Sequence, residues 1–328
     1  MIAQLYSPKQ ADLSKTTMFP VWDRHNLVRI DTLANPNEAS SDFNAPELFV
    51  LAEKIKEARA NGRPVVLFYG AHVIKCGFSR YLIALVKRGL VTHLASNGAG
   101  SIHDFEMAYL GGTSEHVPTA IEDGSFGMWA ETGAWMNDAI RSGHTRGMGY
   151  GKALATAIAE NPDRYPHRDD CVFYQAYLNG VAATYHVSIG TDIIHQHPRA
   201  DFGAIGATSG LDFSAFVHSI CHLEGGVFIN MGSAVTGPEV FLKSLSIARN
   251  QGFVVQKITT ANFDMVNLGD YRTNIADNKP EYYYRPRKNV INRPASMGGT
   301  GLYICGDHRQ TMPALYKLLE GSEPQCPK

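Results

Sequence analysis

Residues 227–250, VFINMGSAVTGPEVFLKSLSIARN, decide the fold expected for this chain. They open with a compact apolar run that predicts a buried strand, and a small-residue turn, Gly-Ser-Ala at 232–234, follows it. Pro238 then stands where a helix favours proline, in its first turn, and Gly252 lies just beyond the helical pattern. A strand, a small-residue turn and a helix form the repeating unit of doubly wound α/β domains, in which such a turn presents backbone N–H groups to a phosphate. The same pattern also fits a βα turn without a ligand.

Helical and strand patterns alternate through the rest of the chain. Expected helices lie at 46–60, 78–88, from about 103, at 152–160, 175–179, 214–223 and 308–319, and expected strands at 65–69, 91–95, 180–187, 253–260 and 302–305. Residues 70–77 are expected to form a loop, and a second small-residue turn is expected at 96–101. Such alternation favours a parallel sheet with helices on both faces. The sequence therefore predicts an α/β, Rossmann-like, doubly wound parallel sheet.

The chain is expected to divide into an N-terminal arm and one large domain. Residues 1–44 are polar and broken by prolines, and residues 45–328 show neither an internal repeat nor a low-complexity linker. We therefore expect residues 1–44 to form the arm and residues 45–328 to form a single large domain.

The composition of the 328 residues is that of an ordinary globular protein, with 44% hydrophobic and 19% charged residues. A net charge of -1 gives no electrostatic footprint for nucleic acid. No apolar run is long enough to span a bilayer, and the N-terminus lacks the apolar core of a secretory signal. We expect a cytoplasmic protein that binds neither nucleic acid nor membrane, with reduced thiols at Cys76, Cys171, Cys221, Cys305 and Cys326.

Six segments occur in an order that resembles the deoxyhypusine synthase family. They are VVLFYGAHVIKCGFSRYLIALVKRG, SNGAGSIHDF, SIGTDII, FINMGSAVTG, TTANFD and CGDH, and they span residues 65 to about 319. The resemblance implies a Rossmann-like domain that binds NAD and a tetramer with sites at subunit interfaces. It also implies hydride transfer to bound NAD and transfer of a group through a lysine imine.

Residue by residue, the resemblance implies a set of cofactor-binding positions. They are His72, Ser96, Asn97, Gly98, Ala99, His103, Asp192, Gly232, Ser233, Ala234, Thr260, Asp264 and Asp307. These residues follow predicted strands, and ligands of open α/β sheets bind at the carboxyl ends of strands. The three carboxylates suit ribose hydroxyls or the nicotinamide amide.

Three positions depart from the family pattern. His103 stands where the family has an acidic residue on the adenosine ribose, Pro238 replaces a histidine of the substrate pocket, and His197 replaces an aspartate that binds the polyamine. A cationic polyamine needs carboxylates to hold it. The departures therefore argue against spermidine and leave an unidentified small molecule as the expected substrate.

Lys288 is the expected catalytic residue, in the loop PEYYYRPRKNVINRP. Its spacing from Pro280 resembles that of the family's imine-forming lysine. A neutral amine is the nucleophile in such chemistry, and nearby Arg285 and Arg287 would favour the neutral form. The loop also fits a solvated basic segment, and its three tyrosines fit a ligand cover or a subunit interface.

Other chemistries have weaker support in the sequence. His218 and His222 are four residues apart on an expected helix, but neither they nor residues 195–197 form a complete zinc motif, so no metal is expected. Residues 206–210 do not form a G-x-S-x-G nucleophile elbow. The sequence thus predicts an NAD-dependent transferase that forms a homotetramer. The alternative is an NAD-binding sensor or scaffold without transfer chemistry.

Overall fold

The computed structural model describes residues 7–273 and 280–321, so Cys326 lies outside the described residues. The strands are β1 (Val28–Arg29), β2 (Val65–Tyr69), β3 (His93–Asn97), β4 (Gly112–Thr113), β5 (Ala182–His186), β6 (Val227–Met231), β7 (Thr259–Asp264) and β8 (Thr300–Cys305). The α-helices are α1 (Pro46–Ala60), α2 (Ala71–Lys75), α3 (Ser79–Lys87), α4 (Gly98–Leu110), α5 (Val117–Asp123), α6 (Ala130–Thr145), α7 (Tyr150–Glu160), α8 (Val172–Leu178), α9 (Phe202–Cys221), α10 (Thr236–Asn250), α11 (Arg293–Ala295) and α12 (His308–Leu318). Short 3-10 helices lie at Leu13–Lys15, Val21–Asp23, Ile30–Thr32, Pro36–Glu38, Pro162–Arg164, Arg168–Asp170, Ile193–Gln196 and Pro280–Tyr283, and a π-helix, η9, lies at Pro286–Asn292.

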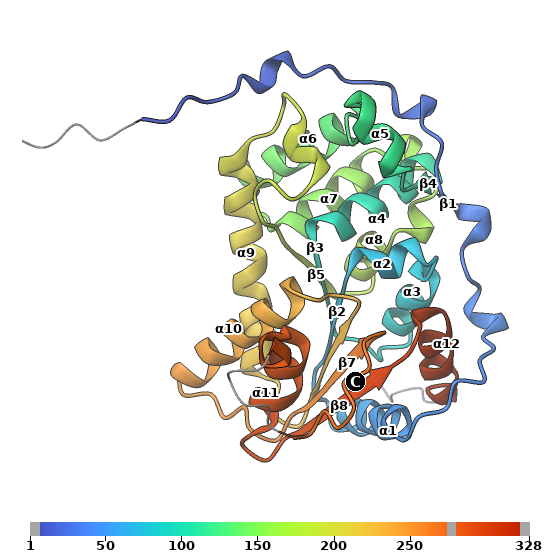
Figure 1. The fold of residues 1–328 in the computed structure, drawn as a ribbon, viewed down its shortest axis with the longest axis vertical. Coiled ribbons are helices and arrows are strands. Elements are labelled where there is room, and N and C mark those ends of the chain that lie inside the picture. Colours follow the sequence, from blue (N-terminus) through green and yellow to red (C-terminus); the bar gives the residue numbers. More distant parts are fainter. Residues whose placement is uncertain (1–6, 274–279, 322–328) are drawn as a thin grey trace, which may run out of the picture.

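The main sheet has six strands in the order β5-β3-β2-β6-β7-β8, and every neighbouring pair is parallel (Figure 1). Counted along the sheet by chain order, this is the 3-2-1-4-5-6 arrangement of doubly wound dinucleotide-binding domains. The predicted fold class is confirmed.

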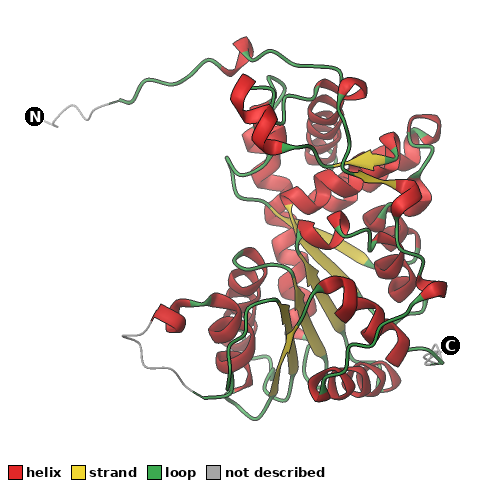
Figure 2. Ribbon diagram, turned by 45° about the vertical axis from the view of Figure 1, so that its right-hand side comes forward, coloured by secondary structure: helices red, strands yellow, loops and turns green. Residues whose placement is uncertain are grey.

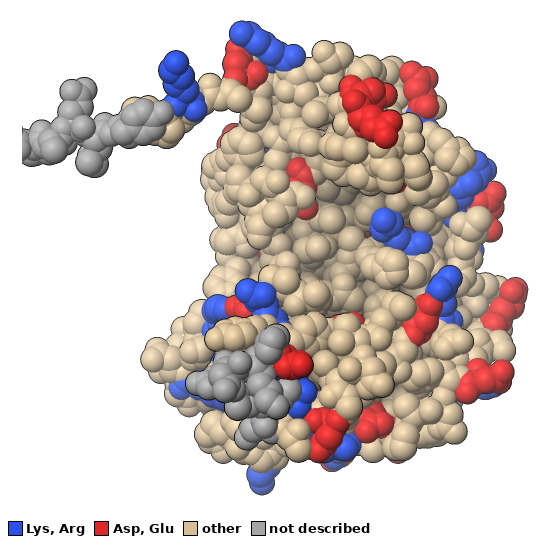
Figure 3. Space-filling view, in the orientation of Figure 1, with Lys and Arg blue, Asp and Glu red and all other residues tan. Residues whose placement is uncertain are grey.

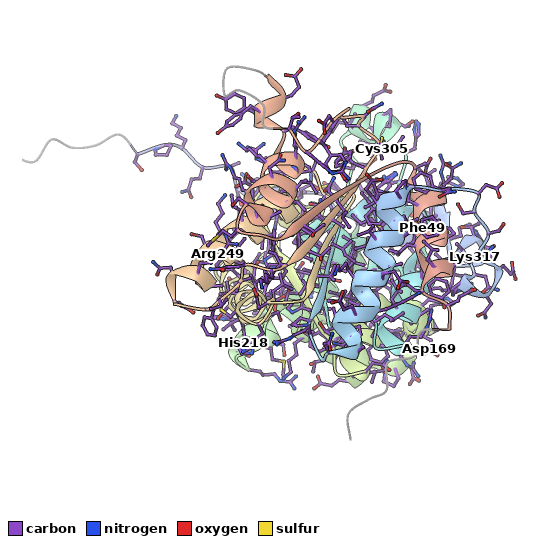
Figure 4. The ribbon with its side chains drawn as sticks, turned by 90° about the horizontal axis from the view of Figure 1, so that it is seen from below. Phe49, Asp169, His218, Arg249, Cys305 and Lys317 are labelled. Atoms are coloured by element: carbon purple, nitrogen blue, oxygen red, sulfur yellow. The ribbon has the colours of Figure 1, made fainter. Side chains whose placement is uncertain are left out.

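Helices cover both faces of this sheet, because its central strands are apolar on both faces. All five residues of β2 are buried. Leu67 joins a core cluster with residues of α1, α3 and α12, whereas Phe68 points the other way into a cluster with residues of α9 and α10. In the view from below, the labelled residues of α1 and α12 lie on one side of the sheet and those of α9 and α10 on the other (Figure 4).

The segment quoted first behaves as its pattern predicts. All five residues of β6 are buried, and α10 begins at Thr236, two residues before Pro238. Phe228 of β6 stacks on Phe241 of α10, with ring centroids 3.7 Å apart and ring planes 5° from parallel. Aromatic contacts of this kind contribute about 0.5–1.5 kcal/mol beyond area burial, so this pair fixes α10 against the sheet.

The N-terminal residues lie along the surface of the sheet domain (Figures 1 and 2). The backbone of Phe19 accepts from Ala130 and donates to Met128, both at 2.8 Å. β1 pairs antiparallel with β4. These contacts hold the segment in place and bring its side chains to the upper half of the molecule.

Several expected boundaries are wrong. Residues 70–77 contain α2, α4 begins at Gly98 instead of near residue 103, and α9 begins twelve residues before position 214, at Phe202. The expected strand at 253–260 is the largest error, because β7 begins only at Thr259. Phe253 and Val254 are 41% and 63% exposed, whereas Val255 and Ile258 are buried in the core although they precede the strand. A short apolar run does not by itself distinguish a strand from other buried backbone, which made the pattern misleading.

Candidate functional site

The sheet changes winding direction between β2 and β6, and this point is where doubly wound sheets bind ligands. The carboxyl ends of the strands reach mid-height in Figure 1, where the same face is hollowed in Figure 3. The N–H of Gly70 donates to the carbonyl of Met231 at 2.8 Å. A Cβ at Gly70 would lie 2.0 Å from the Gly232 carbonyl oxygen, so the backbones of the turns after β2 and β6 are in direct contact.

The turn after β6 requires glycine. Gly232 has φ +69, a conformation that L side chains rarely adopt. A Cβ there would lie 2.9 Å from His308 Nε2. Ser233 Oγ accepts from the N–H of Gly237 at 2.9 Å and so caps the first turn of α10, while Ala234 is exposed beside it. The turn is therefore held rigidly while its backbone stays accessible.

His308 was not among the residues expected from the sequence. It is 5% exposed, and burial, followed by the neighbouring His72, lowers its pKa, so the ring is neutral at physiological pH. The His72 and His308 ring centroids are 6.1 Å apart. The only signal in the sequence was its place next to Asp307, because nothing in the pattern shows that its ring turns inward toward Gly232.

The turn after β3 is built by polar side chains. The hydroxyl of Ser96 is buried and donates to the Tyr69 carbonyl at 2.6 Å, which ties β3 to β2. Asn97 Oδ1 accepts from the N–H of Gly100 at 3.0 Å and caps α4, so it satisfies one of the first-turn N–H groups. Gly98 begins α4 directly beside the carboxylate of Asp192. Ser96 and Asn97 shape the turn, Gly98 is buried beneath Asp192, and Ala99 lines the cavity beside the sheet edge.

Asp192 is the most unusual carboxylate at this edge. It is 7% exposed, and burial raises its pKa to about 7. Within residues 7–273 and 280–321, its Oδ2 has no hydrogen-bond partner. Neighbouring His195 accepts through Nδ1 from the N–H groups of Gly190 and Asp192, at 3.1 and 3.2 Å, which leaves the proton of the neutral ring on Nε2. Oδ2 of Asp192 is thus a buried acceptor without a partner among the described residues, while the side chain also caps the 3-10 helix Ile193–Gln196 through the His195 backbone.

Asp264 and Asp307 lie at the ends of β7 and β8. Asp264 accepts from the N–H groups of Met265 and Val266, at 2.7 and 3.2 Å, and from the Tyr284 hydroxyl. Asp307 caps α12, and hydrogen bonds from Arg309 lower its pKa to about 2. Both carboxylates face the same sheet edge as Gly232, as expected.

Thr260 does not lie at that edge. It is the second residue of β7, four residues before Asp264, so about 13 Å of strand separates it from the carboxyl end. Its side chain is fully buried. The misplaced strand at 253–260 put Thr260 at a strand end, and correcting the boundary moves it into the core.

His103 lies on α4 and faces a cavity of about 210 Å³ beside the sheet edge. Its Nδ1 lies 2.7 Å from Thr113 Oγ1, and burial lowers its pKa to about 4. Ala99 and Asp192 line the same cavity. Position 103 therefore carries a neutral imidazole instead of the negative charge of a carboxylate.

Lys288 lies on η9, and its ammonium is 5.3 Å from the ring centroid of Tyr282 and 5.4 Å from that of Tyr283. The arginines expected to act on it have other partners. Arg285 pairs with Glu239 at 2.9 Å, and Arg287 donates to the backbone carbonyls of Asp270 and Thr273. Aromatic faces stabilise the charged ammonium.

The charged residues of the cavity were also missed in the sequence. They come from four separate elements, and no spacing links them: Arg24, Lys75, Glu106 and Glu115. Arg24 reaches the cavity because β1 pairs with β4. This pairing and the backbone hydrogen bonds of Phe19 are tertiary contacts, and they bring the N-terminal segment to the site.

The residues at the sheet edge fit NAD. A Cβ at Gly70, Gly98 or Gly232 would collide with the Gly232 carbonyl, the Asp192 carboxylate or His308, so the turns pack closely together, and of the three glycines Gly232 stays partly exposed at the edge. Asp192 and Asp264 offer carboxylate acceptors of the kind that bind ribose hydroxyls. The carboxylate acceptors and the partly exposed small-residue turn at Gly232 therefore match what a dinucleotide needs.

Neither protein-family models nor curated proteins match the sequence. Among solved structures, AgrE in its ternary complex with ornithine and NAD+ is 16% identical, with a TM-score of 0.51 over 87% of this chain and 34% of AgrE. A protein from Methanococcus maripaludis described as LOR/SDH is 16% identical, with a TM-score of 0.49 over 86% of this chain and 72% of the other. One from Entamoeba histolytica described as a deoxyhypusine synthase is 10% identical, with a TM-score of 0.43 over 83% and 86%.

The AgrE comparison shows a shared fold. This chain spans about a third of AgrE and of ArgZ, an arginine dihydrolase from cyanobacteria.

No helix in the described part of the chain is long and apolar enough to cross a membrane. Among the same residues, no three His, Cys, Asp or Glu side chains are grouped as a metal would need, and His222 Nδ1 instead lies 2.8 Å from the His218 carbonyl.

Proposed function

We propose that this chain binds NAD across the sheet edge at Gly70 and Gly232 and uses it in a reaction on a small-molecule substrate. The observation that carries the proposal is the close approach of these two glycines at the point where the winding reverses. Bound NAD would supply a hydride acceptor. Its pyrophosphate would lie against the turns at Gly232–Ala234 and Gly98–Ala99, its ribose hydroxyls would donate to Asp264, and Asp192 would lie between the cofactor and the substrate.

The neutral ring of His308 lies beside Gly232, so it adds no charge next to the cofactor. His72 and Asp307 lie at the rim of the same edge. These residues would position the cofactor, and the substrate would lie beyond them. The resemblance to deoxyhypusine synthase supports hydride transfer followed by group transfer through Lys288, whose neutral amine would attack a carbonyl carbon and release water to leave an imine.

A second candidate function is binding of NAD without transfer chemistry, in a sensor or scaffold. The position of Lys288 favours it, because the Lys288 nitrogen lies against the rings of Tyr282 and Tyr283 and the residue does not line the cavity beside the sheet edge.

We also propose a homo-oligomer, with a tetramer as the expected state. Large apolar side chains near the sheet edge are exposed in the single chain, among them Ile189 at 54%, Phe202 at 40% and Val235 at 51%. Clustered apolar surface of this kind favours association. Light scattering that gives the mass of one chain at micromolar concentration would contradict this part of the proposal.

The experiment for the cofactor is a thermal unfolding series with increasing NAD. A ligand that binds only the folded state stabilises it by RT ln(1 + [L]/Kd), so the midpoint must rise with NAD concentration. ATP serves as the control for general nucleotide binding. Absence of any rise at millimolar NAD would remove the basis of both candidate functions, whereas a rise without NADH formation on any substrate supports the second.

A further inference from the structure

The cavity beside the cofactor edge holds both signs of charge. Arg24 and Lys75 supply cationic groups, and Glu115 and Asp192 supply carboxylates. Its apolar lining includes Ile102, Phe126 and Ile193. A cavity of about 210 Å³ is large enough for a small metabolite.

Three polar atoms of this lining are buried and have no hydrogen-bond partner within residues 7–273 and 280–321. They are Arg24 Nη2, Glu115 Oε2 and Asp192 Oδ2. Buried polar groups are normally satisfied, so a donor and two acceptors left around one cavity call for a ligand that supplies the missing partners.

These side chains are fixed in place by their other contacts. Arg24 Nη1 donates to Glu106 at 2.8 Å, and the two side chains are 3% and 1% exposed. Glu115 Oε1 accepts from the N–H of Gly127 at 3.1 Å and from the Trp129 indole at 3.0 Å. The second nitrogen of Arg24 and the second oxygen of Glu115 are buried and have no partner among the described residues.

The charges select the kind of ligand. Glu106 offsets the charge of Arg24 within the protein, which leaves Lys75 exposed at the rim against the carboxylates of Glu115 and Asp192. A group with N–H donors and positive charge suits the two carboxylates, and a carboxylate suits Arg24 and Lys75. A polyamine without a carboxylate would be repelled by Arg24 and Lys75. A carboxylic acid without an amine would be repelled by Glu115 and Asp192.

We propose that this cavity binds a small zwitterion of the amino-acid class, whose ammonium donates to Glu115 and Asp192 and whose carboxylate accepts from Arg24 and Lys75. The inference rests on the proposed function, because Ala99, His103 and Asp192 border both the cavity and the expected cofactor position. It names the substrate class that the cofactor would act upon.

Isothermal titration of the full chain, with and without saturating NAD, tests this inference. The probes are L-alanine, L-glutamate and L-lysine, with propylamine and propionate as single-group analogues and AMP as a probe for an adenosine site. We expect at least one amino acid to bind and both single-group analogues to bind at least about tenfold more weakly, because each loses charge-assisted hydrogen bonds.

Glu115→Gln is the decisive variant. The Gln oxygen can still accept from Gly127 and Trp129, so the amide N–H₂ replaces an acceptor by a donor inside the cavity. We expect amino-acid affinity to fall about tenfold or more, with the NAD-induced rise in melting temperature retained. Glu122→Gln, the same change at an exposed position of α5, should alter neither.

The possible failures are distinguishable. Binding of NAD but of none of the three amino acids would overturn this inference and leave the proposed function standing. AMP binding that weakens in Glu115→Gln together with NAD binding would make the cavity the adenosine half of the cofactor site and would also overturn it. Amino-acid binding by a chain whose melting temperature NAD does not raise would overturn the proposed function alone.

Discussion

The carboxylate of Asp192 lies directly over the Cα of Gly98, where a Cβ at position 98 would be 1.9 Å from Asp192 Oδ2. This contact joins the loop after β5 to the first residue of α4, at the border between the sheet edge and the cavity. A residue with any side chain at position 98 would displace the buried carboxylate. The absence of a side chain at Gly98 is therefore what allows Asp192 to occupy its position.

Replacement of Asp192 by Asn should change the pH dependence of stability. The folded-state pKa of Asp192 is raised to about 7 from 3.8. The protonated form is favoured in the folded protein, so its contribution is fully present below pH 3.8 and is lost as the pH rises through 7. The difference of about three pH units corresponds to at most about 4 kcal/mol.

Asp192→Asn removes that loss, so the variant should be more stable than the parent at pH 8 and similar to it at pH 4. Urea unfolding at both pH values measures the difference. The exposed Asp163→Asn serves as the control and should show no such trend. Equal stability of Asp192→Asn and the parent at pH 8 would contradict a buried ionised carboxylate.

Gly232→Val should abolish the rise in melting temperature caused by NAD. The substitution places a branched side chain against His308 and into a turn with φ +69. Gly252→Val is a matched control, since Gly252 has φ +88 but a Cβ there would meet nothing within 4 Å. Both variants should lose roughly 1–3 kcal/mol through backbone strain.

Only Gly232→Val should also lose the response to NAD in thermal unfolding. If NAD stabilised both variants equally, the turn at Gly232 would not be part of the cofactor site.

Spermidine should not serve as a substrate. His197 is 6% exposed, its Nδ1 accepts from the N–H of Arg199 at 3.0 Å, and its ring packs on Gly133, while Pro238 is buried in the first turn of α10. Neither position offers a carboxylate to a polyamine. Chromatographic analysis of reactions with spermidine and NAD should therefore detect no diaminopropane, and its formation would show that the substrate inference is wrong.

Lys288→Arg separates the two candidate functions. If Lys288 forms an imine, borohydride treatment with NAD and an amino acid that binds should add mass to the peptide that carries it. Arginine keeps the charge but is not an amine nucleophile, so the variant should lose the adduct and retain the NAD response. Mass spectrometry of the digested protein measures both. An adduct that persists in the variant would place the reactive amine elsewhere, and no adduct in the parent favours NAD binding without transfer.

The sequence alone determined the layers of this protein and the strand ends at which the cofactor site is proposed. Apolar runs such as residues 65–69 and 227–231 are buried on both sheet faces, and local periodicity records that burial directly. The small-residue turn at 232–234 could also be predicted from the sequence, because the positive φ of Gly232 is a local backbone requirement that glycine meets.

The tertiary structure alone decided which side chains share the cavity. Arg24, Lys75, Glu115 and Asp192 come from distant parts of the chain and meet through the β1–β4 pairing and the packing of α4. It also moved Thr260 into the core and showed Lys288 against two tyrosines. A local pattern reports which face of an element is buried, whereas the partners of a charged side chain depend on long-range packing that no spacing encodes.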